Sequence, residues 1–191
     1  MIYAAVQPEV TDPKAFAGKK VAILAAHGVQ ESELIFPYEF LKARGAQVDI
    51  VAPSWSEGRV LVVQYVRPTL WAQANETFTT AAAKTYDLIV LTGGAWNSTV
   101  VRNDGEAIKL IQAHARANRP VAAICSGTQI LINADLTSGH RLTGTSTAKV
   151  DLVNAGATYL DQPVVVDDQI ITSRSPEDLV PFVNAIAEAL K

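Results

Sequence analysis

The sequence predicts one α/β domain built on a mostly parallel sheet, and three observations support this. Apolar runs of about four to six residues alternate with helical patterns along the chain, as buried parallel strands do. A strand, a helix and a second strand fit within residues 21–53, which makes a βαβ unit. The run 120–124 ends at Cys125, the only cysteine, and Gly127 follows. That spacing is typical of a strand that turns sharply into a helix.

The first half of the predicted sheet follows from three kinds of pattern. Residues 21–26 form a short apolar run and predict the first strand. Apolar side chains at helical spacing over 34–41, closed by Gly45, predict a helix. Residues 47–53 predict the next strand, and the alternation over 59–66 predicts a hairpin or an edge insertion.

The second half continues the alternation of strands and helices. Residues 87–92 predict a buried strand, and a loop holding Trp96 and Asn97 leads to a helix over 106–117. The strand before Cys125 comes next. The remaining expected elements are helices over 129–134 and 147–154, strands over 163–167 and 169–173, and a terminal helix opened by Ser175, Pro176, Glu177 and Asp178.

Length and composition fit a single domain. The 191 residues are 49% hydrophobic, enough for a sizeable core. We expect residues 1–18 to form an N-terminal arm and residues 19–191 to form the domain. A net charge of −3 with scattered cations argues against nucleic acid as a partner. One cysteine excludes an internal disulfide, and without a long apolar span or a secretory signal pattern we expect a cytoplasmic protein with no membrane partner.

Cys125 is the first candidate for chemistry. The pattern Ala123-x-Cys125-x-Gly127 is the cysteine form of the nucleophile elbow, which holds a reactive atom out over the sheet edge. The N–H groups of a following helix would favour the thiolate. The alternative is that Cys125 is a small buried hydrophobe, as free cysteines often are.

Three loops are expected to converge on one crevice, because they follow the carboxyl ends of adjacent parallel strands: residues 27–33, the loop that begins with Gly93–Gly94, and the elbow at Cys125–Ser126. The glycine pair Gly93–Gly94 makes either a tight turn or, with the N–H of Ser126, an oxyanion hole. His27 could act as a base or substrate ligand, or it could cap its loop. Trp96 and Asn97 would stand at the pocket mouth, where an aromatic residue bounds a small-substrate site or a subunit contact.

The sequence offers no recognisable site for a metal or a cofactor. It contains no C-x-x-C, no H-E-x-x-H and no dense cluster of His, Asp and Glu. Gly93–Gly94 lacks the glycine spacing that a dinucleotide requires. A class I glutamine amidotransferase would need a downstream His paired with a Glu, and His140 has no acid two residues later.

Four motifs together resemble the DJ-1/PfpI superfamily, from about Lys19 to the C-terminus, and residues 151–157 are most similar to its PfpI-like branch. The motifs are Ala-Ile-Cys125-Ser-Gly, Glu33-Leu-Ile-Phe-Pro, Gly93-Gly94, and the stretch from Thr172 to Leu179. The resemblance implies a flavodoxin-like three-layer sandwich that forms a homodimer or an assembly of dimers. It also implies that Cys125 is a nucleophile or oxidisable thiol, that Glu33 transfers its proton, and that the amides of Gly94 and Ser126 bind an oxyanion. On the residues alone, Glu33 would be an ordinary acid at a helix N-terminus.

The resemblance implies a cofactor-independent cysteine enzyme acting on small reactive carbonyls, of the glyoxalase or deglycase kind. The first alternative is a redox or stress-response protein in which Cys125 is oxidised without turnover. Hydration of isocyanides is a second alternative, and peptidase activity is a third. Ser126 stands where peptidase-like members have a His, and peptide hydrolysis needs a general acid for the leaving amine. That substitution counts against the peptidase.

Overall fold

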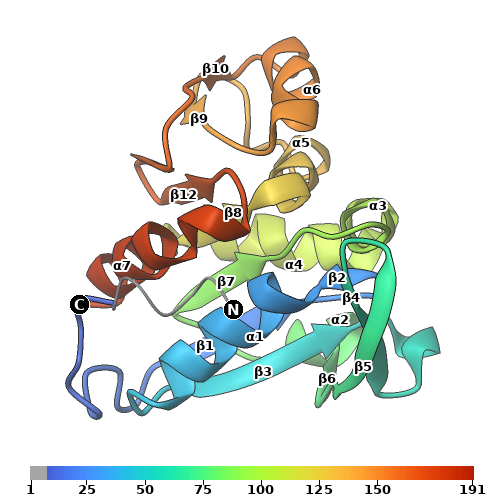
Figure 1. Ribbon diagram of the computed structural model, residues 1–191, viewed down its shortest axis with the longest axis vertical. Coiled ribbons are helices and arrows are strands. Elements are labelled where there is room, and N and C mark those ends of the chain that lie inside the picture. Colours follow the sequence, from blue (N-terminus) through green and yellow to red (C-terminus); the bar gives the residue numbers. More distant parts are fainter. Residues whose placement is uncertain (1–7) are drawn as a thin grey trace.

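The computed structural model describes residues 8–191, and its centre is a seven-stranded sheet covered by helices on both faces (Figure 1). The strand order is β11-β12-β8-β7-β1-β3-β6, and only β11 runs antiparallel to its neighbour. The strands of this sheet are β1 Lys20–Leu24, β3 Gln47–Ala52, β6 Glu76–Thr77, β7 Leu88–Leu91, β8 Val121–Ile124, β11 Val164–Asp167 and β12 Ile170–Ser173. The predicted α/β fold with a mostly parallel central sheet is confirmed.

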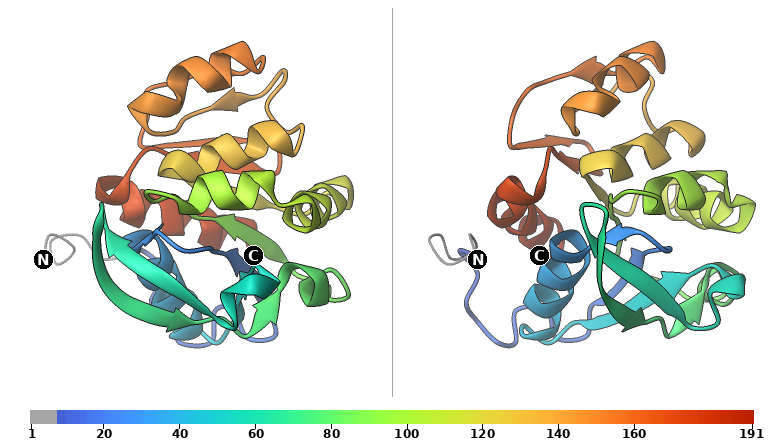
Figure 2. Two further views of the ribbon diagram at one scale, coloured as in Figure 1. Left: turned by 90° about the vertical axis from the view of Figure 1, so that its right-hand side faces the viewer. Right: turned by 45° about the vertical axis from the view of Figure 1, so that its right-hand side comes forward.

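The helices form two layers. They are α1 Glu31–Lys42, α2 Phe78–Ala81, α3 Asn97–Asn103, α4 Gly105–Arg116, α5 Ile130–Asn133, α6 Lys149–Asn154 and α7 Leu179–Ala189. Figure 2 shows α1 and α7 together on one side and α3 and α4 on the other. Strand β1 explains why both faces need cover, because Val21 and Ile23 enter one buried apolar cluster while Ala22 and Leu24 enter the other. Alternate side chains of a strand point to opposite faces.

The predicted hairpin exists, but it is not inserted at the edge of the main sheet. β4 Arg59–Gln64 and β5 Arg67–Gln73 pair antiparallel, and β4 pairs with β2 Val29–Gln30 to make a separate three-stranded sheet. β9 Arg141–Leu142 and β10 Thr158–Tyr159 form a further small sheet that the sequence did not predict. Two-residue strands are too short to give a readable alternation.

Helix α3 is a second difference, since a loop was expected around Trp96 and Asn97. Its sequence, Asn-Ser-Thr-Val-Val-Arg-Asn, has no apolar stripe and contains three β-branched residues with modest helix propensity. The helix buries polar side chains instead, Asn97 and Ser98 among them. Apolar periodicity therefore does not predict this helix.

The described part of the predicted N-terminal arm packs on α1. Phe16 is buried, and its ring centroid lies 5.8 Å from that of Phe40. The Arg44 Nε donates to the Val10 carbonyl at 2.6 Å. The first seven residues of the predicted arm lie outside the described residues, and the division at residue 18 remains a prediction. Within residues 8–191, no helix is both long and apolar enough to cross a membrane.

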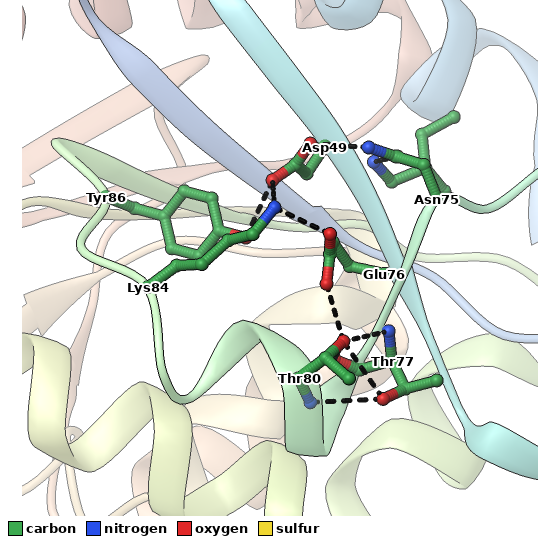
Figure 3. Close-up of polar contacts among 8 residues, drawn as sticks. Asp49, Asn75, Glu76, Thr77, Thr80, Lys84 and Tyr86 are labelled. Atoms are coloured by element: carbon green, nitrogen blue, oxygen red, sulfur yellow. Dashed lines mark hydrogen bonds and ion pairs between the residues drawn. The ribbon is translucent and has the colours of Figure 1, made fainter.

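A polar cluster closes the edge of the sheet at β3 and β6 (Figure 3). The ammonium of Lys84 lies 3.0 Å from the Asp49 carboxylate and 2.6 Å from that of Glu76. Tyr86 donates its hydroxyl proton to Asp49 at 2.8 Å. The cluster joins the short strand β6 and the turn after α2 to the longer strand β3. We assign it a structural role, because its members already satisfy one another.

Candidate active site

Cys125 stands at a sharp turn directly after β8. Its φ of +59° is in the left-handed region, which L-residues other than glycine seldom occupy. Gly127 makes the turn possible, since a Cβ built there would lie 2.5 Å from the Leu91 carbonyl oxygen. A strained backbone at a single reactive residue is typical of a functional site. The geometry is that of a nucleophile elbow.

Glu33 reaches this turn from the first turn of α1. Its side chain is 0% exposed, and Oε2 accepts the backbone N–H of Gly93 at 2.7 Å. The carboxyl also lies near the Cys125 thiol, close enough for its negative charge to act on the sulfur. Oε1 is buried and has no hydrogen-bond partner among the described residues. The Gly93 amide therefore fixes one carboxyl oxygen and leaves the other for the site.

The thiol and the carboxyl both titrate abnormally. Burial raises the pKa of Glu33 to about 8, although the Gly93 N–H opposes the shift. Burial also raises the pKa of the Cys125 thiol, and the nearby Glu33 charge raises it further. Removing both protons would leave two buried negative charges in contact, so the two groups titrate as one unit. Near neutral pH both groups are protonated, and above about pH 8 the pair keeps one proton that either group can carry.

This differs from the expectation that a following helix would favour the thiolate. The segment after Cys125 is a 3-10 turn, Cys125–Gln129, and the α-helix α5 that continues it has only four residues. Few aligned peptide dipoles therefore point at the sulfur. The N–H of Ser126 does lower the pKa of the thiol, but burial and the Glu33 charge act more strongly in the other direction.

The predicted oxyanion donors lie beside the sulfur, but one of them is engaged. The N–H of Gly94 donates to the Ser126 Oγ at 3.1 Å, and that hydroxyl donates back to the Gly94 carbonyl at 3.3 Å. Ser98 donates to the same Ser126 Oγ at 3.1 Å. No sequence pattern pointed to Ser98, because a serine in a short polar stretch has the same pattern whether it is buried or exposed.

A cavity of about 250 Å³ opens over Cys125. Its lining residues come from five segments that are distant in the sequence: Gln30, Glu33, Tyr65, Val66, Gly94, Ala95, Cys125, Ser126 and Pro176. Tyr65 and Val66 form the tip of the β4–β5 hairpin, and the Gln30 Oε1 accepts the N–H of Tyr65 at 2.8 Å. None of these lining residues carries a positive charge. The sequence predicted the hairpin but not that its tip would reach the site.

None of the four residues predicted to form the substrate pocket lines this cavity. The His27 Nδ1 accepts the N–H of Leu61 at 3.1 Å, and its ring lies edge-on to Trp55 and Trp71. His27 therefore caps its loop, the alternative to a catalytic role. Trp96 is 51% exposed and lies over Gly28. Gly93 is also absent from the lining, but it does hold Glu33.

Asn97 is the fourth of these residues, and it is structural. Its Oδ1 accepts the N–H of Ala26 at 2.6 Å, and its Nδ2 donates to the carbonyls of Thr92 and Gly93 at 2.6 and 3.1 Å. The amide thus ties the ends of β1 and β7 together and fixes the turn that contains Gly93. Buried polar groups of this kind are costly to leave unpaired.

Asn97→Ala is expected to destabilise the fold by about 2–4 kcal/mol, because several buried groups lose their partners together. Urea unfolding followed by circular dichroism measures the change. Asn103→Ala is the matched control, since its Nδ2 bonds the Thr99 carbonyl on the exposed side of the same helix. A loss for Asn97→Ala no larger than that of the control would show that the tie contributes little.

The structure brings together one set of possible metal ligands that the sequence did not predict. Ligand atoms of His140, Asp167 and Asp168 all lie within 4.8 Å of one another. Asp167 is already paired, because the Arg141 guanidinium lies 2.7 Å from its Oδ1 and the His140 Nδ1 lies 3.0 Å from its Oδ2. We therefore assign no metal site to this cluster.

These features define a class: an α/β protein with a strained cysteine at a strand-to-turn elbow and a buried carboxylic acid beside the sulfur. The chain belongs to the DJ-1/PfpI family, whose model matches residues 19–189. It is 32% identical over 172 residues to Deglycase TK1284 of Thermococcus kodakarensis, covering 90% of this chain and 99% of the relative. It is 30% identical over 166 residues to General stress protein 18 of Bacillus subtilis, covering 86% and 94%. The structure of Drosophila melanogaster DJ-1beta superposes with a TM-score of 0.82 at 26% identity, covering 90% of each chain.

Proposed function

We propose that the protein is a cysteine-dependent enzyme that acts on small, uncharged reactive carbonyl compounds. The observation that carries the proposal is the buried Cys125–Glu33 pair, which opens onto a cavity of about 250 Å³. Relatives named deglycases support a deglycase-like activity at the level of the family.

The chemistry begins with addition of the sulfur to the carbonyl carbon. The C–S bond forms as the C=O π bond breaks and its electron pair moves to oxygen. Glu33, which holds a proton near neutral pH, gives that proton to the oxygen and receives the thiol proton in return. The product is a neutral hemithioacetal, and the carboxyl ends as it began. No net charge is created in the buried site. A thiolate without a proton donor beside it would instead leave a buried alkoxide, which is costly.

The walls of the cavity favour an uncharged substrate. Two residues in the cavity wall, Glu33 and Cys125, have raised pKa values and are therefore uncharged near neutral pH. No lysine, arginine or histidine of the described chain lines the cavity. An oxo acid would therefore bring a carboxylate into a site with nothing to pair it. Methylglyoxal, an uncharged dicarbonyl, is a suitable probe, and with water it yields lactate without an oxidant or a reductant.

The single cysteine allows a direct test without mutation. Cys125 is the only thiol of the chain and reacts with iodoacetamide far faster than its other groups, so conversion of methylglyoxal to lactate should fall in proportion to the fraction labelled once, which mass spectrometry of the intact chain measures. Lactate production that persists in fully labelled protein would contradict the proposal. Absence of turnover, together with peroxide oxidation of Cys125, would favour the redox alternative.

A further inference from the structure

Two backbone amides of the glycine turn next to Cys125, those of Gly93 and Gly94, already donate to other groups of the protein. Gly93 donates its N–H to the buried Glu33 Oε2 at 2.7 Å. Gly94 donates its N–H to the Ser126 Oγ at 3.1 Å. An oxyanion site works when its donors point at the position of the developing charge. Here the Ser126 oxygen is the atom at which the Gly94 donor points.

Of the two occupying groups, the Ser126 hydroxyl is the one that can leave. Glu33 is fully buried and forms part of the proton-transfer pair. Ser126 is only partly buried and borders the cavity together with Gly94. Rotation of a serine hydroxyl requires a change of a single side-chain torsion between staggered positions. Such a rotation would release the Gly94 N–H towards the cavity.

Ser98 holds the hydroxyl where it is. This side chain lies in α3, is 3% exposed, and donates to the Ser126 Oγ at 3.1 Å. Ser126 in turn donates to the Gly94 carbonyl at 3.3 Å. The Ser126 hydroxyl therefore accepts two hydrogen bonds and donates one. These three bonds hold it in the position that a substrate oxygen would take beside the Gly94 N–H.

We propose that the Ser126 hydroxyl is a displaceable latch on the oxyanion-binding amide of Gly94, anchored by Ser98, and that the substrate oxygen must push it aside. The inference rests on the proposed function, because it assigns the role to carbonyl addition at Cys125. Ser126 and Ser98 are positioning residues in this account. They set how readily the Gly94 donor becomes available.

Two reactions of the same sulfur separate the latch from the general reactivity of Cys125. Alkylation by iodoacetamide expels iodide and develops no oxyanion, so it reports the thiol alone. Addition to methylglyoxal forms a C–S bond and places charge on an oxygen that the Gly94 N–H can stabilise. The ratio of the two second-order rate constants, each measured by mass spectrometry of the intact chain, therefore reports the oxyanion donors.

Ser126→Ala removes the latch and should raise the ratio of addition to alkylation by about 2- to 12-fold, the range expected for one net hydrogen bond. Ser98→Ala should raise it by a smaller factor, because the latch loses one of its bonds. Ser56→Ala is the matched control, since Ser56 is buried but its Oγ has no hydrogen-bond partner among the described residues. Its ratio should equal that of the wild type.

A ratio in Ser126→Ala at or below the wild-type value would overturn the latch and make the hydroxyl a permanent donor instead. Addition that is seen only in Ser126→Ala would support it strongly. If the wild type forms the adduct but produces no lactate, the proposed function fails while the ratio still decides the latch. Absence of adduct in both proteins overturns both, because a freed Gly94 amide should then bind an oxygen.

Discussion

Glu33→Gln is expected to lower kcat for methylglyoxal by about 10²- to 10⁴-fold, the usual contribution of a general acid–base group. The glutamine side chain has nearly the same volume and can keep the contact with the Gly93 N–H, so the fold should survive. It cannot exchange a proton with the Cys125 thiol. Steady-state kinetics measure the loss, and Glu31→Gln, two residues earlier in the same helix, is the matched control.

The same substitution should change how stability depends on pH. The pKa of Glu33 in the folded chain, about 8, lies above its ordinary value of 4.5. Between about pH 4.5 and pH 8, Glu33 therefore holds a proton in the folded state that it has released in the unfolded state. The stability from the protonated carboxyl is fully present below about pH 4.5 and is lost as the pH rises through about 8. Thermal unfolding of the wild type should weaken across that window by at most about 1.4 kcal/mol per pH unit relative to Glu33→Gln. Parallel curves for the two proteins would show that Glu33 titrates normally.

Gly94→Ala is expected to destabilise the protein by about 2–5 kcal/mol and to abolish activity. Gly94 has a φ of +124°, which L side chains rarely adopt. A Cβ there would clash with the Gly28 carbonyl oxygen and lie 2.5 Å from the Gln30 nitrogen, and both are backbone atoms that cannot rotate away. Relief of the clash would move the amide that faces Ser126.

Two further glycines separate the causes of that loss. Gly139 also has a positive φ, of +81°, but a Cβ there meets nothing within 4 Å, so Gly139→Ala reports backbone strain alone. Gly105, at the start of α4, has neither constraint, and Gly105→Ala should be close to neutral. If all three variants unfold at the same urea concentration, the close approach at Gly94 has no energetic consequence.

The elbow could be predicted from the sequence because it depends on local pattern: an apolar run, a small residue and Gly127 dictate the turn at Cys125. The role of Glu33 was predicted only through the resemblance to the DJ-1/PfpI superfamily, because its local pattern is that of an ordinary acid at a helix N-terminus. His27 shows the limit of this reasoning. It leaves β1 on the expected loop, but whether its ring faces the crevice depends on Trp55 and Trp71, which come from other segments.

The contacts that shape the cavity could not be predicted, because they are made between distant parts of the chain. Tyr65 reaches the site through pairing of β4 with β2, which brings its N–H to Gln30. Ser98 becomes important only because α3 packs beside the turn after Cys125. The raised pKa of Glu33 likewise depends on complete burial, which the assembled fold supplies and local sequence does not.

The pH dependence of Cys125 alkylation shows whether Cys125 and Glu33 share a proton. In the wild type, the rate should show a rise centred near pH 8, where the pair loses its first proton. In Glu33→Gln that rise should disappear and leave a single one above about pH 8.5, the ordinary thiol value, because the buried thiol then titrates alone. An identical profile in both proteins would show that the two groups do not share a proton, and the proposed mechanism would fail.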